Sequence, residues 1–332
     1  MQFADHFALA ELPYFELHDG RLVAVGADEW GPAIDAHTHL ALSYVRRASV
    51  DLTAAHDQTL HYLPTSSSVD LDVYMNRNFS VDQLRALKRD LTLGVLVGGA
   101  MRATHTAANL TREMAELGIV ASVLLPIDMP VLSRNAQQYL ELARDTGAIV
   151  SLGSVHPHAR NVRGRLAAQK AAGARGVKVH PAVQLIAPDH PRAMALYAAC
   201  AELSLPVFFH CGPVGIETQA ARRRCQLERY LPPVTEHPDC TFVLGHSGAL
   251  QMEQGLELAR RHDNVWLELA SQSLSNVREI IRRGPTNRIV FGSDWPFYHQ
   301  APGLAKVLLA TEGEPQLRRR VLHDNAERLF GI

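Results

Sequence analysis

The sequence predicts an α/β fold in which eight strands, most of them followed by a helix, close into a (β/α)8 barrel. Short apolar runs alternate with segments of helical periodicity from residue 119 to the end of the chain. These runs are rich in β-branched residues, as expected of parallel strands that are covered on both faces. A chain of 332 residues is also long enough for one barrel with additional segments.

Eight apolar runs fit the strands of such a barrel. In chain order they span residues 33–39, 119–125, 149–155, 176–180, 206–210, 241–246, 265–269 and 289–294. Helical periodicity follows the later runs, at residues 135–146, 163–172, 191–203, 218–230, 252–261, 275–283 and 314–329. An open doubly wound sheet is the alternative. The sequence disfavours it because no Gly-x-Gly-x-x-Gly motif follows the first strand.

Two segments lie outside this repeat. Residues 14–25 contain two short strand-like runs around an Asp-Gly pair, which predicts a β-hairpin flap within a small N-terminal unit, residues 1–32. The barrel domain then occupies residues 33–332. After its first strand, residues 43–117 form a long insertion, polar at first and then helical. Long loops in compact domains are usually binding loops or lids, so we predict a lid; disorder is the alternative.

The composition is that of an ordinary globular enzyme. Hydrophobic residues make up 47% of the chain and charged residues 20%, and the formal net charge is -1, so no basic surface for nucleic acid is predicted. The N-terminus lacks a basic region followed by an apolar run, and no stretch is apolar enough to span a bilayer. The four cysteines show no disulfide framework. We therefore expect a cytoplasmic protein with no nucleic-acid or membrane partner.

His37 and His39 lie at the end of the first predicted strand. Because strand side chains alternate between faces, the two imidazoles project from the same side. Neutral imidazole is a common ligand for zinc. A chance His-x-His pair is expected in a chain with 17 histidines, so this pair alone does not identify a metal site.

Four later strands also end in side chains that can bind a metal or a proton. Their sequences are Val-Lys-Val-His-Pro at 177–181, Val-Phe-Phe-His-Cys-Gly at 207–212, Leu-Gly-His-Ser-Gly-Ala at 244–249 and Phe-Gly-Ser-Asp-Trp-Pro at 291–296. In a barrel the carboxyl ends of the strands surround one mouth, so these side chains and the histidine pair are expected to converge.

The ordered set of metal-type residues resembles that of the amidohydrolase superfamily of metal-dependent TIM barrels, and the motifs most resemble its amidohydrolase-related (amidohydrolase 2) branch. The set comprises His37, His39, Lys178, His210, His246 and Asp294. The closing sequence Asn-Ala-Glu-Arg-Leu-Phe-Gly, residues 325–331, is similar to the last helix of that branch. The resemblance extends from residue 34 to the C-terminus, with the insertion unmatched.

This resemblance implies a role for each residue. His37, His39, His210 and Asp294 would bind a divalent metal, with zinc the best fit and manganese or iron as alternatives. Asp294 would also be the general base toward a water activated by that metal. His246 would either bind a second metal or polarise the substrate carbonyl, and the residues do not separate these roles.

Lys178 determines the number of metal ions. It is either a carbamylated bridge between two ions, an ammonium that binds a substrate carboxylate, or part of a structural ion pair. His180 and Arg222 are candidate substrate contacts, with simple packing and a solvated helix face as the respective alternatives. Glu268, in the seventh strand, faces either the barrel interior or the helix layer.

The leading functional prediction is a metal-dependent hydrolase that opens a carboxylic ester, lactone or amide bond with metal-activated hydroxide. The alternative is a lyase on the same scaffold, either a decarboxylase or a hydratase. A small carboxylate-bearing substrate and a homo-oligomeric assembly are expected. A non-catalytic binder is disfavoured, because the ligands and the acid/base carboxylate are all present.

Overall fold

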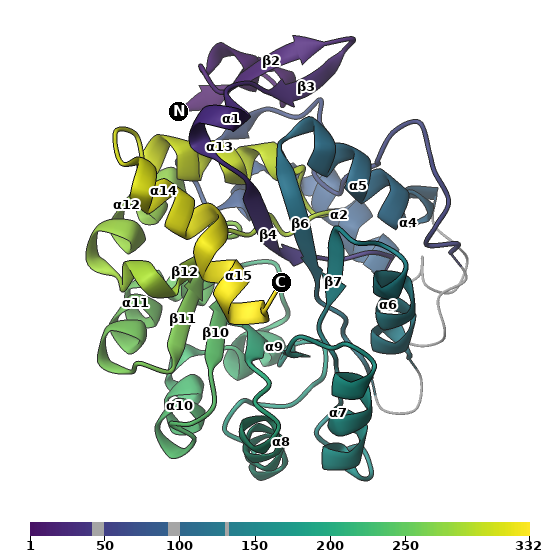
Figure 1. Cartoon of the computed structure of the whole chain (residues 1–332), viewed down its shortest axis with the longest axis vertical. Coiled ribbons are helices and arrows are strands. Elements are labelled where there is room, and N and C mark those ends of the chain that lie inside the picture. Colours follow the sequence, from purple (N-terminus) through teal and green to yellow (C-terminus); the bar gives the residue numbers. More distant parts are fainter. Residues whose placement is uncertain (42–49, 92–99, 130–132) are drawn as a thin grey trace.

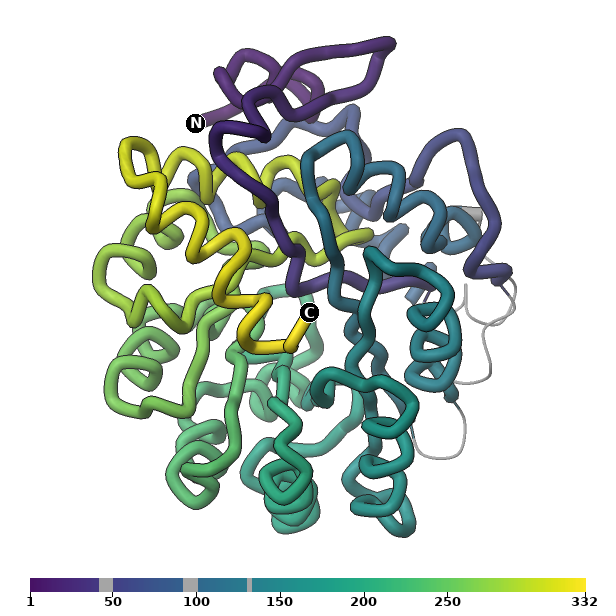
Figure 2. The backbone as a smooth tube through the Cα atoms, viewed as in Figure 1, coloured from purple at the N-terminus to yellow at the C-terminus, as the bar shows by residue number. Residues whose placement is uncertain are grey.

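The computed structural model describes four segments of the chain, which Figures 1 and 2 draw in colour: residues 1–41, 50–91, 100–129 and 133–332. Parts of the predicted insertion, residues 43–49 and 92–99, therefore lie outside the described residues.

Eight parallel strands form a closed barrel, which confirms the predicted fold class. They are β4 (Ala33–Thr38), β6 (Ile119–Leu124), β7 (Ile149–Ser151), β8 (Val177–Val179), β9 (Val207–His210), β10 (Phe242–Gly245), β11 (Val265–Glu268) and β12 (Ile289–Val290). Strands β4, β6 and β7 pair in one sheet, and β8 to β12 pair in another. Two parallel bridges join the sheets, one from Gly153 to Val177 and one from Thr38 to Trp295. The barrel has no open edge as a result.

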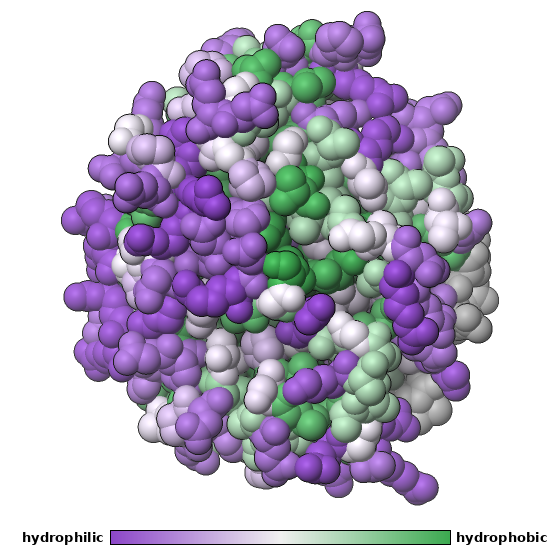
Figure 3. Space-filling view, in the orientation of Figure 1, coloured by the Kyte–Doolittle hydropathy of each residue, from purple (hydrophilic) through white to green (hydrophobic). Residues whose placement is uncertain are grey.

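Helices surround the barrel (Figure 1). After β6 they are α6 (Asn135–Arg144), α7 (Val162–Ala171), α8 (Pro191–Glu202), α9 (Gln219–Arg224), α10 (Leu231–Glu236), α11 (Met252–Arg261), α12 (Leu274–Arg283), α13 (Gln300–Ala310), α14 (Pro315–Arg319) and α15 (Asn325–Phe330). Short 3-10 or π turns link some of them, at η4 (Leu227–Tyr230), η5 (His246–Gln251), η6 (Thr286–Arg288) and η7 (Arg320–Asp324). On α12, for example, Val277 and Ile280 are buried while Arg282 faces solvent. Figure 3 shows the result as a hydrophilic surface over α11 and α12.

Alternate strand positions fill the barrel interior with apolar side chains. This cluster contains Ile34, Val123, Leu152, Phe208, Val243, Trp266 and Val290, and Ala326 and Phe330 of α15 join it. Helix α15, which crosses the middle of Figure 2, therefore closes the amino end of the barrel. At the other end, the Phe208 ring lies 5.2 Å from the His37 ring and 4.7 Å from Lys178 Nζ. Phe208 is thus the floor on which the predicted site lies.

The N-terminal segment contains the predicted hairpin. Strand β2 (Phe15–His18) pairs antiparallel with β3 (Arg21–Ala24), and the turn residues Asp19 and Gly20 both have positive φ. The other elements are β1 (Gln2–Phe3), η1 (Phe7–Glu11) and α1 (Ala27–Trp30). Arg21 pairs with Glu116 at 2.7 Å, which places the hairpin beside α5 (Ala107–Glu116).

The insertion packs against both the N-terminal unit and the barrel. Its described elements are β5 (Val69–Asp70), η2 (Met75–Asn78), α2 (Val81–Arg89), α4 (Ala100–Ala103) and α5. Strand β5 pairs with β1, and Met75 N donates to Ser271 O at 2.9 Å. In the described part of the chain, no helix combines the length and apolar character that crossing a bilayer requires. All four cysteines are free and buried.

Candidate metal centre

The strand ends bring the six predicted metal-type residues around one cavity. This cavity has a volume of about 240 Å³, and its lining includes His37, His39, Lys178, His210, His246 and Asp294. Asp294 Oδ1 lies 3.4 Å from Nε2 of His37 and 3.5 Å from Nε2 of His39. The cavity wall also includes Tyr74 and Asn76 of the insertion, whereas no residue from 1–32 lines it.

Hydrogen bonds to Nδ1 orient three of the imidazoles. His39 Nδ1 donates to the Leu125 carbonyl at 2.7 Å, and His246 Nδ1 donates to the Ala270 carbonyl at 3.3 Å. Because a carbonyl can only accept, Nδ1 carries the proton and Nε2 of each neutral ring is unprotonated. His37 Nδ1 donates in the same way to the Glu268 carboxylate at 2.9 Å. Each of the three rings therefore has a free lone pair on Nε2.

This arrangement fits a divalent metal. The Nε2 lone pairs of His37 and His39 face an oxygen of Asp294 with no proton between them, so three acceptors lie together without a donor. The ligand atoms of His37, His246 and Asp294 lie within 4.8 Å of one another. Imidazole nitrogen and carboxylate oxygen are donors that zinc binds in proteins, and a cation would satisfy all of these atoms.

Burial favours the neutral form of His37, His210 and His246. It holds the pKa of His37 well below its ordinary value, and the nearby Lys178 acts in the same direction. Burial also lowers the pKa of His246 to about 4 and that of His210 well below its ordinary value. Only the neutral imidazole binds a metal, so these shifts keep the ligands competent at neutral pH.

Glu268 faces the barrel interior and is the partner of His37. Its carboxylate accepts from His37 Nδ1 at 2.9 Å, from the His246 backbone N–H at 2.8 Å and from the Ala270 backbone N–H. Burial raises the pKa of Glu268, and the two backbone N–H donors act in the opposite direction; because its oxygens face only N–H groups, the geometry fits the ionised carboxylate. One buried carboxylate thus orients His37 and holds the loop that carries His246. The sequence alone had not determined whether Glu268 faces the barrel interior or the helix layer.

Two motif glycines let the donor-bearing segments approach one another. A Cβ on Gly292 would overlap the Glu268 carboxylate and come within 2.8 Å of the His37 Cβ. A Cβ on Gly212, where φ is +84°, would overlap the backbone of Gly248. His246 and Asp294 themselves have φ of 58° and 66°. Non-glycine residues seldom adopt this conformation, and it is concentrated at functional sites.

Lys178 provides a buried amine in the same cavity. Its Nζ atom has no hydrogen-bond partner and lies 4.7 Å from the centroid of the Phe208 ring. Burial lowers the pKa of Lys178 to about 8, against the attraction of Asp294 and Glu268.

The two predicted substrate contacts have different positions. His180 lines the cavity and stacks on His210, with ring centroids 4.0 Å apart. Arg222 is exposed on α9 and is absent from the cavity wall, because the buried face of that helix is formed by residues such as Ala221. The structure does not bring Arg222 to the site, and its charge lies on a solvated helix face.

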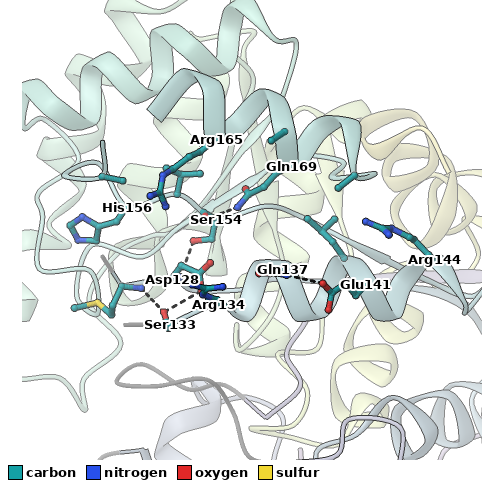
Figure 4. Close-up of a pocket in the computed structure, with 16 residues that line it drawn as sticks. Asp128, Ser133, Arg134, Gln137, Glu141, Arg144, Ser154, His156, Arg165 and Gln169 are labelled. Atoms are coloured by element: carbon teal, nitrogen blue, oxygen red, sulfur yellow. Dashed lines mark hydrogen bonds between the residues drawn. The ribbon is translucent and has the colours of Figure 1, made fainter. Parts of the chain in front are cut away.

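A larger cavity of about 590 Å³ lies between α6 and α7 (Figure 4). Arg165 and Gln169 of α7 line it opposite residues at the start of α6. Its half-buried acid, Asp128, accepts from Ser133 at 3.2 Å and from the Asn135 backbone N–H at 2.7 Å, and so caps α6. None of the six metal-type residues lines this cavity.

His61, Glu113 and His299 form a second group with metal-type donors. Glu113 Oε2 accepts from Trp295 Nε1 at 2.8 Å and lies 3.2 Å from His61 Nε2. His299 Nδ1 accepts from the Ala301 backbone N–H at 3.2 Å, which leaves the proton of a neutral ring on Nε2, facing Glu113. Hydrogen bonds to Glu113 therefore account for the nitrogens that face it, although His61 Nδ1 has no partner, and the group holds Trp295 next to Asp294.

The fold and the site together define a TIM-barrel enzyme with candidate metal ligands at the carboxyl ends of its strands. Residues 34–332 match the family model described as Amidohydrolase (amidohydrolase 2). The chain belongs to this amidohydrolase family, as the motifs predicted. A search of curated proteins found no significant match.

Several solved structures share the fold. An uncharacterized TIM-barrel protein from Bordetella bronchiseptica is 18% identical with a TM-score of 0.62, over 91% of this chain and 99% of that chain. A probable 2-pyrone-4,6-dicarboxylic acid hydrolase from Acinetobacter baumannii, with citric acid bound, is 16% identical with a TM-score of 0.57, over 91% and 100%. A 5-carboxyvanillate decarboxylase from Novosphingobium aromaticivorans, complexed with manganese and 4-hydroxy-3-methoxy-5-nitrobenzoic acid, is 13% identical with a TM-score of 0.59, over 90% and 99%. These similarities establish the fold.

Proposed function

We propose that this protein is a metal-dependent hydrolase that cleaves an ester, lactone or amide bond in a small carboxylate-bearing substrate. The observation that carries the proposal is the group of acceptors formed by Asp294 Oδ1 and the Nε2 atoms of His37 and His39, 3.4 and 3.5 Å away. This group lies in a cavity that also contains the unpartnered amine of Lys178.

His37, His39 and Asp294 would hold the metal, with His210 and His246 as the other nitrogen donors of the cavity. When bound, the metal supplies a Lewis acid that lowers the pKa of water and polarises the substrate carbonyl. His246 is a metal ligand in this proposal and does not polarise the substrate carbonyl. Its Nδ1–H donates a hydrogen bond to the Ala270 carbonyl, so its Nε2 has no proton to donate to a substrate oxygen. Zinc and manganese both accept nitrogen and oxygen donors of this kind.

Asp294 is the general base of the proposed reaction. Its carboxylate lies at the cavity wall, 9% exposed, where it can accept a proton from the attacking water and return it to the leaving group. Glu268 is a positioning residue, because it holds the His37 ring at 2.9 Å and does not line the cavity.

Lys178 anchors the substrate carboxylate in this proposal. In this proposal the amine is an ammonium rather than a carbamate: burial disfavours its charge, and the carboxylates of Asp294 and Glu268 and the face of the Phe208 ring partly offset that effect. An ammonium without a protein partner supplies charge-assisted hydrogen bonds to an anionic ligand. The proposed centre therefore contains one metal ion rather than two.

Decarboxylation by the same residues is the second candidate. The ligand atoms of His37, His246 and Asp294 lie within 4.8 Å of one another, close enough to share one ion, and Lys178 lines the same cavity. The 5-carboxyvanillate decarboxylase and a 2,6-dihydroxybenzoate decarboxylase share the fold. A hydratase would need the same carboxylate anchor.

The test uses protein reconstituted with zinc or with manganese. Lactones, N-acyl amino acids and carboxylated phenols are incubated in H₂¹⁸O, and the products are analysed by mass spectrometry together with released CO₂. The proposal expects a new carboxylic acid that contains one ¹⁸O, loss of this product in Asp294→Asn, and normal turnover in the exposed control Asp239→Asn. Release of CO₂ without hydrolysis assigns the lyase, and a protein that binds no metal refutes both.

A further inference from the structure

We infer that the substrate carries a cationic nitrogen group, an ammonium or a guanidinium, which Glu217 binds. Glu217 lies on the loop between β9 and α9 and lines the cavity that contains the candidate metal ligands. The inference rests on the proposed function, because it specifies the substrate of that same cavity.

Glu217 is half-buried, and both oxygens of its carboxylate are out of contact with solvent. Neither Oε1 nor Oε2 has a hydrogen-bond partner among the described residues. The two fully buried glutamates in the described part of the chain are satisfied: Glu268 accepts three N–H groups, and Glu113 accepts from Trp295. Glu217 therefore differs from Glu268 and Glu113 in that neither of its carboxylate oxygens accepts a hydrogen bond.

A ligand can supply the missing partner. An isolated carboxylate away from water is costly, and a charge-assisted hydrogen bond from a cationic nitrogen offsets that cost better than a neutral donor does. The cavity wall near Glu217 in sequence is apolar, with Val214 and Ile216, and Leu87 and Val183 add to it. Apolar surroundings strengthen an electrostatic contact, so this position favours a cation over a neutral group.

The loop that carries Glu217 is held in place. Asn76 of the insertion donates to the Val214 carbonyl at 3.0 Å, and the Tyr298 hydroxyl donates to the Asn76 side-chain oxygen. Lys178 belongs to β8 and lies against the Phe208 floor, whereas Glu217 belongs to a loop beyond the end of β9. Loops after the strands form the outer part of a barrel mouth, so Lys178 lies at the inner end of the cavity and Glu217 lies nearer its mouth.

Calorimetric binding to the zinc-loaded protein tests this assignment with ligands of graded length. The amino acids 4-aminobutyrate, 6-aminohexanoate and 8-aminooctanoate are compared with the alkanoates of equal size, pentanoate, heptanoate and nonanoate, and with the matching ω-hydroxy acids. Hexylamine tests the cation alone. At the best length, the amino acid is expected to bind at least about tenfold more tightly than its alkanoate.

Three variants assign that preference to Glu217. Glu217→Gln is expected to lose the preference for the amino acid while binding alkanoates as the wild type does. The substitution removes an unpaired charge, so the melting temperature should not decrease. Glu217→Asp should keep a preference for the amine. The control Glu228→Gln changes an exposed glutamate outside the cavity and should behave as the wild type.

Each contrary outcome has a distinct meaning. Equal binding of amines and alkanoates at every length, or a preference that survives in Glu217→Gln, overturns the inference. Hydroxy acids that bind as well as amino acids overturn the cationic class. If hexylamine binds through Glu217 while alkanoates do not bind, the inference stands and the carboxylate anchor of the proposed function fails. If no ligand binds, the inference is overturned.

Discussion

Replacing Glu268 by glutamine perturbs the metal centre without touching the cavity wall. The carboxylate accepts three N–H groups, from His37 Nδ1, from His246 N and from Ala270 N. An amide has nearly the same shape, but its NH₂ group would face one of these donors. The His37 ring would lose its anionic partner, and one buried N–H group would lose its acceptor.

The expected magnitude follows from these two losses. Removing the carboxylate partner of a metal-binding histidine typically weakens metal affinity about 10- to 100-fold, which corresponds to about 1.4–2.7 kcal/mol. A buried N–H group left without an acceptor costs about 1–3 kcal/mol in stability. We therefore expect Glu268→Gln to raise the metal Kd by at least about tenfold and to lower the melting temperature of the metal-free protein.

The assay is zinc competition between the metal-free protein and a chromophoric chelator at pH 7.5. Glu312→Gln, an exposed glutamate outside the cavity, is the matched control and should bind zinc as the wild type does. Glu268→Asp keeps the charge and should retain more affinity than Glu268→Gln. A folded Glu268→Gln protein with wild-type affinity, or the reverse order of the two variants, would refute the role given to Glu268.

Asp294→Asn should reduce turnover about 10²- to 10⁴-fold in steady-state assays with little change in melting temperature; near-normal turnover would exclude Asp294 as the base. Lys178→Met should raise KM for carboxylated substrates while elemental analysis finds unchanged metal content, whereas loss of metal that Lys178→Glu restores would indicate a carbamate bridge. Burial lowers the pKa of His105 from 6.5 to about 4, so the unfolded chain takes up a proton first and the folded state loses stability as pH falls through that interval. Urea midpoints measured from pH 7 to pH 4 should decline less steeply in His105→Gln, and parallel curves would contradict the assignment. Glu113→Leu should lower the free energy of unfolding by about 1–3 kcal/mol because Trp295 Nε1 loses its acceptor, while the exposed control Glu236→Leu should cost less; equal losses would show that the Trp295 contact contributes nothing.

The barrel was predictable from the sequence because its strands are buried on both faces. Such strands appear as uninterrupted apolar runs, and each of the eight predicted runs contains an observed strand. Their lengths were less predictable. The run at 289–294 contains only the two residues of β12, because strand pairing ends at Phe291, whose N–H donates to the Val321 carbonyl instead of to a neighbouring strand.

The wall of the cavity was not predictable in the same way. Asn76 and Val214, which hold the Glu217 loop, are 138 residues apart, and Tyr298 lies 222 residues from Asn76. Local periodicity carries no information about such contacts. A buried acid without a partner also has the same sequence signature as a solvated one, so Glu217 could be recognised only once its surroundings were known.

Glu268, in contrast, left a signal in the sequence. Trp266 packs inside the barrel, and strand alternation then places Glu268 on the same inner face. A lone carboxylate there requires donors, and the residue that leaves room for it is Gly292, just beyond the neighbouring strand β12. Any side chain at 292 would collide with the Glu268 carboxylate and the His37 Cβ. The Phe-Gly-Ser-Asp motif therefore meets two requirements of the candidate metal centre. Asp294 provides a carboxylate ligand, and Gly292 provides the space in which Glu268 and His37 meet.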